Sequence, residues 1–99
     1  MYKIFITEEF RRVFVQCDGA ERLWIEKVKE GLAHYPSGKI IHFPWFREKK
    51  FGNKRLYFII DEVSQRILLI NFSNKKEQKI TIRFILKNMS VLFEELRSD

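Results

Sequence analysis

The sequence has few of the residues that mark special chemistry. Of its 99 residues, one is cysteine, two are histidine, two are proline and four are glycine. A lone cysteine, Cys17, cannot form an internal disulfide, which favours a reducing compartment such as the cytoplasm. One cysteine and two histidines cannot supply a zinc-finger spacing. The glycines form neither a dinucleotide-binding motif nor a P-loop, so we expect no metal and no small-molecule cofactor.

Long hydrophobic runs are also absent. The longest, residues 56–60 and 67–70, have the length of strands and fall short of the ~18 residues of a membrane helix. Charged residues after residue 6 break any signal-peptide core. The chain is nevertheless 45% hydrophobic and 15% aromatic, which is too apolar for a disordered protein. Its length fits one domain, residues 1–99, with no membrane association expected.

Positive charge is concentrated in one part of the chain. The formal net charge is +6, but residues 39–87 alone carry twelve basic and four acidic side chains. A basic surface of this size is typical of proteins that bind a polyanion such as a nucleic acid. Solvated charge that keeps a protein soluble gives the same composition, so charge alone leaves both interpretations open.

Hydrophobic periodicity predicts an α+β domain. We expect a strand over residues 1–6, helices over 7–16 and 20–34, a bent extended segment over 39–50, strands over 54–61 and 66–72, and a helix over 77–96. The order β-α-α-β-β-β-α predicts a mostly antiparallel, four-stranded sheet. Both faces of its central strands are apolar, so we expect a helical hairpin on one face and the C-terminal helix on the other.

The hairpin around residues 52–53 carries the chemistry-bearing side chains. Gly and Asn suit a tight turn because they tolerate positive φ. Arg47 and Lys49 alternate onto one face of the first strand, and Arg55 and Tyr57 share a face of the second. If the hairpin brings these faces together, they form a cationic patch with an aromatic ring. Such a patch suits phosphates and an unpaired base.

The segment from Phe46 to Glu77, FREKKFGNKRLYFIIDEVSQRILLINFSNKKE, resembles the central hairpin and following strand of the RelE/ParE toxin superfamily of toxin–antitoxin systems. The similarity implies a RelE-like toxin of a type II system, with an antitoxin protein as partner. RelE-like members are metal-independent endoribonucleases that cut mRNA on the ribosome, and the 2′-hydroxyl of the RNA is the nucleophile.

The resemblance also implies roles for particular residues. Arg55 matches an arginine that clamps the scissile phosphate, and Arg47 and Lys49 match basic residues of which one is the general base. Lys76, or Lys75, matches a basic residue that acts as acid or transition-state cation. We expect further RNA contacts from Lys50, Lys54, Tyr57, Lys75, Lys79 and Arg83.

Alternatives remain open at this stage. The neighbouring charges Glu48, Lys50 and Lys54 are equally interpreted as solubilising charges on an edge strand, which leaves the roles of Arg47 and Lys49 open. Glu48 is another candidate base, of a kind used by some relatives, but alternation places it on the face opposite Lys49. The C-terminal Tyr or His of many active relatives is missing here. A non-catalytic protein of the same fold, either a ParE-like gyrase inhibitor or a binding module, is therefore the alternative function.

Overall fold

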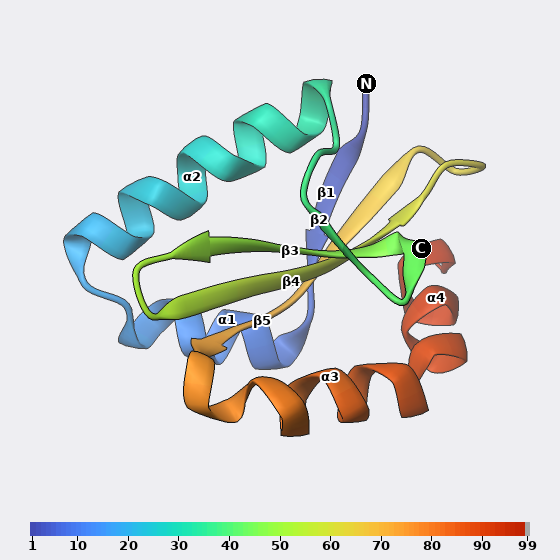
Figure 1. Ribbon diagram of the computed structural model, residues 1–99. Helices are drawn as coiled ribbons and strands as arrows, with labels where there is room; N and C mark the ends of the chain where they lie inside the picture. Colours follow the sequence, from blue (N-terminus) through green and yellow to red (C-terminus); the bar gives the residue numbers. More distant parts are fainter. Residues whose placement is uncertain (99) are drawn as a thin grey trace.

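A computed structural model describes residues 1–98 as an α+β domain (Figure 1). The elements in chain order are β1 (Lys3–Ile6), α1 (Glu8–Gln16), α2 (Gly19–His34), β2 (Lys39–Ile41), β3 (Phe43–Phe51), β4 (Lys54–Asp61), β5 (Arg66–Asn74), a 3-10 turn (Lys75–Glu77), α3 (Gln78–Lys87) and α4 (Met89–Arg97). The described residues contain no helix that is both long and apolar enough to cross a membrane.

The strands form one sheet in the order β1-β5-β4-β3-β2. Neighbouring strands are antiparallel except β1, which runs parallel to β5. A parallel neighbour requires a crossover connection, and the rest of the chain between β1 and β5 supplies it. The predicted α+β order and the antiparallel meander are confirmed.

The sheet has five strands within the described residues, so the prediction of four was wrong. The segment expected to run extended from residue 39 to 50 turns sharply at His42, which has a φ of 62°. This left-handed conformation is uncommon outside glycine, although histidine adopts it more often than most residues. The turn folds β2 back onto β3, and Ile41 pairs with Phe43.

Side-chain caps begin the first two helices. The Thr7 hydroxyl accepts a hydrogen bond from the Phe10 amide at 3.0 Å and donates one to the Ile70 carbonyl at 2.7 Å. Asp18 and Glu21 form a reciprocal capping box at the start of α2. Each cap satisfies amides that the first turn of a helix leaves without partners. The Thr7 bond to Ile70 also fixes α1 against β5.

The expected C-terminal helix is two helices with a break at Asn88, so the single helix over residues 77–96 was wrong. Asn88 leaves the helical conformation, with φ −109° and ψ 19°, and its side chain donates to the Phe84 carbonyl at 2.8 Å. Asparagine competes in this way with the backbone bonds that would continue a helix. The bend allows both helices to cover the sheet (Figure 1).

Two cores lie on opposite faces of the sheet, as predicted. One packs α1 and α2 against alternate residues of the central strands, including Leu56, Phe58 and Phe72. The other packs α3 and α4 against the residues between them, including Tyr57, Ile59 and Ile70. We call these the α1/α2 face and the α3/α4 face.

Candidate functional site

The hairpin register separates the predicted catalytic residues. Only Gly52 and Asn53 lie between β3 and β4, so Phe51 pairs with Lys54, Lys49 with Leu56 and Arg47 with Phe58. Cross-strand partners share a face. Arg47 and Lys49 therefore lie on the α1/α2 face, whereas Arg55, opposite Lys50, lies on the α3/α4 face. The expected joint patch of Arg47, Lys49, Arg55 and Tyr57 was wrong, because a two-residue turn pairs odd-numbered residues of β3 with even-numbered residues of β4.

Arg47 and Lys49 hold the loop between α2 and β2. The Arg47 guanidinium donates to the carbonyls of Pro44, at 2.7 Å, and Pro36, at 3.4 Å. The Lys49 ammonium donates to the Ser37 hydroxyl at 3.1 Å. At Gly38 in the same loop, an added Cβ would lie 3.0 Å from the Glu48 carbonyl oxygen. These contacts bind the loop closely to β3, which is a structural role for both cations.

Arg55 instead meets Glu48. The Arg55 Nε lies 3.8 Å from one carboxylate oxygen of Glu48, and the Gln78 amide of α3 donates to the other at 3.0 Å. The two side chains are 8% and 3% exposed. A buried charge pair destabilises a fold unless its remaining hydrogen-bonding groups are satisfied. Arg55 Nη1 donates to the carbonyls of Gly52 and Lys54, at 3.2 and 3.1 Å, whereas Arg55 Nε has no hydrogen-bond acceptor.

Two further buried atoms without partners lie beside this pair. They are the hydroxyl oxygens of Tyr57 and Ser73. In the register, Ser73 is directly opposite Arg55 and Tyr57 is directly opposite Glu48, so all four side chains occupy neighbouring positions of one face. Buried polar groups without partners are rare in folded proteins, and a catalytic role is one explanation for them. We call Glu48, Arg55, Tyr57 and Ser73 the polar cluster.

Tyr57 cannot be the exposed stacking ring that the sequence suggested. Its side chain is fully buried. Burial raises the pKa of its hydroxyl to about 12, with a smaller contribution from the negative charge of Glu48. The tyrosine is therefore neutral at physiological pH, and its ring forms part of the α3/α4 core.

The remaining predicted lysines divide between a structural and a surface position. Lys54 forms an ion pair with Glu21 at 2.8 Å and lies over the Phe72 ring, and the carboxylate raises the pKa of the lysine. It thus joins the hairpin to α2. Lys50 is exposed beside Arg55 on the α3/α4 face. Lys75 and Lys76 are exposed in the 3-10 turn, which the Lys75 amide binds to the Asn53 carbonyl of the hairpin at 2.7 Å.

Lys79 and Arg83 line a shallow groove along α3. The groove is also lined by Gln78 of the same helix and by His42 from the β2–β3 turn. Because Gln78 also bonds to Glu48, the groove begins at the polar cluster. Gln78 was not predicted from the sequence, and Glu48 was set aside there. The parity of the two-residue turn was the available signal for Glu48, whereas only a contact made in three dimensions identifies Gln78.

Metal ligation has no obvious location in the described part of the chain. Among residues 1–98, no three histidine, cysteine, aspartate or glutamate side chains are grouped closely enough to bind a metal ion.

No family model matches the sequence, and no curated protein matches it. Solved structures do match. The isolated E. coli RelE toxin superposes with a TM-score of 0.67 over 85% of this chain and 99% of its own, at 13% identity. In the intact E. coli RelBE toxin–antitoxin complex, the similarity covers 75% of this chain and 96% of that chain, with a TM-score of 0.67 and 14% identity.

An archaeal structure extends the comparison. The RelE–RelB complex of Pyrococcus horikoshii matches 75% of this chain and 94% of its own, with a TM-score of 0.65 and 11% identity. The sequence identities are low, so the similarity is one of fold. The chain therefore has the RelE fold.

Proposed function

We propose that this protein is the toxin of a type II toxin–antitoxin system and cuts mRNA on the ribosome without a metal ion. The observation that carries the proposal is the Glu48–Arg55 pair, which has an unused Arg55 N–H, in a domain with the RelE fold. The matching structures are described as RelE toxins and RelE–RelB complexes, which supports the toxin class and an antitoxin partner. Translation places the proposed action in the cytoplasm, which suits the single cysteine.

The proposed chemistry needs a base, a cation and an acid. Glu48 takes the proton of the 2′-hydroxyl, whose oxygen attacks the adjacent phosphorus. The P–O5′ bond breaks, and the 5′-oxygen receives a proton from Lys76 or Lys75. The products are a 2′,3′-cyclic phosphate and a 5′-hydroxyl. Arg55 stabilises the charge that develops on the phosphate oxygens. Glu48 replaces Arg47 and Lys49 as the base because it shares a face with Arg55.

Gln78 occupies the position proposed for the substrate. Its amide N–H donates to Glu48 at 3.0 Å, as a 2′-hydroxyl would before transfer of its proton. With Glu48 and Arg55 both almost fully buried, this is a closed state. Gln78 is the first residue of α3, so a local movement at this helix end exposes the carboxylate. The proposal therefore requires RNA to displace the Gln78 amide.

An antitoxin helix has a suitable surface on α3 and α4. Ile80, Phe84 and Val91 are 72%, 59% and 59% exposed, and they line one groove that also contacts the start of α1. Exposed apolar side chains at helical spacing bind the apolar side of a partner helix. This groove is separate from the groove that begins at the polar cluster, so antitoxin and RNA contacts involve different residues of α3.

The experiment is mRNA cleavage in a purified translation system. The protein is treated with EDTA beforehand to remove any bound metal ion, and the ribosomes keep their Mg²⁺. The wild-type protein is expected to cut only translated mRNA, and Glu48→Gln and Arg55→Gln are expected to lose about 10²-fold or more of the rate. Lys49→Gln is the matched control from the opposite face and should retain activity. Circular dichroism checks that each variant is folded.

Two outcomes would contradict the proposal. Equal activity of Glu48→Gln and wild type would exclude the carboxylate as base. Absence of cleavage at toxin excess would exclude the nuclease and favour the non-catalytic alternative. Inhibition of gyrase supercoiling then separates a ParE-like inhibitor from a binding module.

A further inference from the structure

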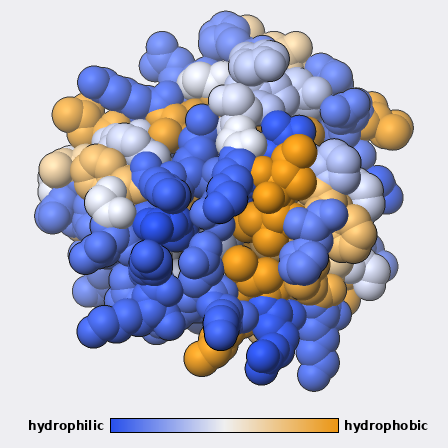
Figure 2. All heavy atoms as spheres, viewed as in Figure 1, coloured by the Kyte–Doolittle hydropathy of each residue, from blue (hydrophilic) through white to orange (hydrophobic). Residues whose placement is uncertain are grey.

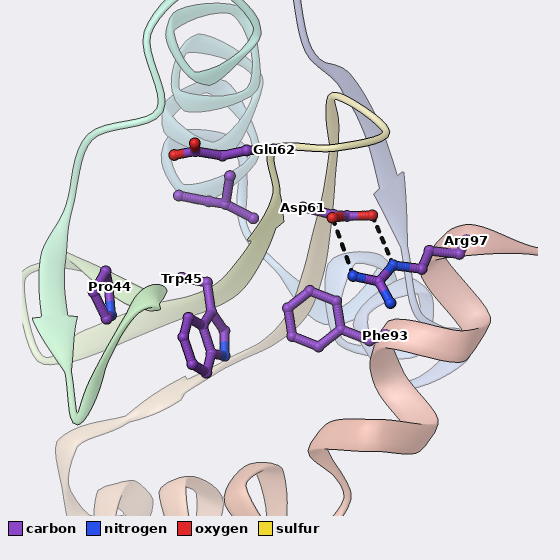
Figure 3. A pocket seen from close by; sticks show the side chains of 7 residues that line it. Pro44, Trp45, Asp61, Glu62, Phe93 and Arg97 are labelled. Carbon is purple, nitrogen blue, oxygen red and sulfur yellow. Dashed lines mark hydrogen bonds and ion pairs between the residues drawn. The ribbon is translucent and has the colours of Figure 1, made fainter.

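Exposed aromatic rings gather where β3 begins. Phe43 and Trp45 are 40% and 38% exposed, and their rings stack at 4.7 Å with an interplanar angle of 3°. Figure 3 shows Trp45 beside Phe93 of α4, and the two ring centroids are 6.4 Å apart in an edge-to-face arrangement. On the face shown in Figure 2, an orange hydrophobic patch interrupts a mainly hydrophilic surface. Exposed apolar side chains that lie next to one another often mark an interaction site.

The aromatic pair lies next to one end of the groove that begins at the polar cluster. His42 lines the groove together with Lys79 and Arg83, and the centroids of the His42 and Phe43 rings are 6.5 Å apart. The groove is therefore basic along α3, and the aromatic pair lies beyond its His42 end. Its near end is Gln78, bonded to Glu48. Glu48 lies five residues along β3 from Phe43, or about 16 Å at the rise of an extended strand.

We propose that this surface binds single-stranded RNA, with unpaired bases stacked on Phe43 and Trp45 and phosphates held by Lys79 and Arg83. The inference deepens the proposed function, because it places the RNA beside the scissile phosphate at Glu48 and Arg55. A planar aromatic pair accepts any base by stacking, and neighbouring cations follow the backbone. The surface would therefore bind RNA with little sequence preference.

Charge favours RNA over a protein helix as the ligand of this surface. The cations that face the groove, Lys79 and Arg83, are exposed, and α3 has no acidic residue. The apolar groove on the other side of α3 has Glu8, Glu9 and Glu95 among its lining residues, which disfavours a polyanion there. The two grooves are therefore opposite in charge. Phe43 adjoins the basic one through His42, whereas Trp45 lines a separate hollow with Asp61, Glu62 and Arg97.

Conformation at His42 gives a second reason to regard the rings as a built feature. His42 holds a φ of 62°, a left-handed conformation that is unfavourable for most residues. This turn brings the His42 ring beside Phe43 and leads directly into the aromatic pair. Strained backbone of this kind occurs often at binding sites, where the surrounding structure maintains it.

The test measures binding without cleavage. A fluorescein-labelled, 2′-O-methyl RNA octamer of mixed sequence has no 2′-hydroxyl to act as nucleophile, and fluorescence anisotropy reports its affinity. Trp45→Leu and Phe43→Leu keep apolar packing but remove the ring, and each is expected to weaken binding about 5- to 150-fold. Tyr35→Leu, which removes a ring that is 76% exposed outside this surface, is the matched control and should bind like wild type.

Salt dependence tests the phosphate contacts separately. Lys79→Gln and Arg83→Gln should each lower the slope of log affinity against log salt concentration by about 0.7, as expected for one lost phosphate contact on a single strand. Unchanged affinity in both leucine variants, with each shown to be folded, would overturn the proposal. The proposal would also be overturned if the leucine variants bound a protein partner more weakly but kept the RNA affinity of the wild type.

The design also separates this inference from the proposed function. If wild type cleaves but the aromatic variants bind and cleave normally, only this inference fails. If the octamer binds as expected but no protein cleaves, only the nuclease proposal fails.

Discussion

At the hairpin end, the two faces of the sheet differ in whether their polar side chains have hydrogen-bond partners. On the α1/α2 face, Leu56 and Phe58 are fully buried, and the cations of Arg47 and Lys49 are hydrogen-bonded to Pro36 and Ser37 in the loop before β2. On the α3/α4 face, Arg55, Tyr57 and Ser73 each bury a polar atom that has no partner. Unpartnered burial destabilises a fold. The α1/α2 face is therefore organised for stability, whereas the α3/α4 face retains unpartnered polar groups that could take part in a reaction.

The largest effect is expected on the α1/α2 face. Phe58→Ala removes a fully buried ring that packs between the sheet and the helices, and it should lower the free energy of unfolding by about 3–5 kcal/mol. Urea unfolding followed by circular dichroism measures this loss. A loss below about 1 kcal/mol would contradict the assignment of this face as the tightly packed one.

A smaller effect, which depends on pH, is expected where α4 meets the sheet. Arg97 forms two hydrogen bonds with Asp61, at 2.8 and 3.2 Å, and together with Ser64 it lowers the pKa of Asp61 (Figure 3). The folded carboxyl thus has a lower pKa than the unfolded one, near 3.9. The pair stabilises the fold fully above that value, and the contribution is lost as pH falls through the folded pKa.

Arg97→Gln tests this contact. The variant should be less stable than wild type at pH 7, and the difference should shrink as pH falls below about 4 because Asp61 becomes protonated. Thermal unfolding at a series of pH values measures both stabilities. A difference that stays constant down to pH 2 would show that Arg97 acts through packing on Phe93, over which its guanidinium lies.

The smallest effect is expected at Tyr57, and its sign tests the comparison directly. Tyr57→Phe removes a buried hydroxyl that has no hydrogen-bond partner, so stability should stay the same or rise by about 1 kcal/mol. Tyr57→Ala is the control that removes the ring as well, and it should be strongly destabilising. A loss above about 1 kcal/mol in Tyr57→Phe would mean that the hydroxyl is satisfied.

Local signals in the sequence predicted most of the fold. Thr7 before two glutamates, the Gly52–Asn53 turn and the apolar runs of β4 and β5 each have a short-range physical cause, and the elements formed there. His42 and Asn88 were missed because neither residue type requires a break in the chain. At both positions the chain adopts a conformation that the local sequence merely permits, and at Asn88 the side-chain bond to the Phe84 carbonyl accompanies the break.

The candidate site was predicted only in part. The sequence located Arg55 and the basic helix start, but it grouped Arg55 with Arg47 and Lys49 on a face that the turn assigns otherwise. Glu48 was recognised as an alternative base, and the same parity that separates it from Lys49 unites it with Arg55. Gln78 lies 30 residues from Glu48, so no local pattern could associate them.

The most direct test of the account is a double variant, Glu48→Leu with Arg55→Met, assayed for ribosome-dependent cleavage and for stability on one preparation. Apolar residues of similar volume often replace a buried ion pair neutrally or with a gain of about 1–4 kcal/mol. We predict a protein at least as stable as wild type that does not cut mRNA. A double variant that is several kcal/mol less stable, or one that still cleaves, would show that the pair belongs to the fold and not to the reaction.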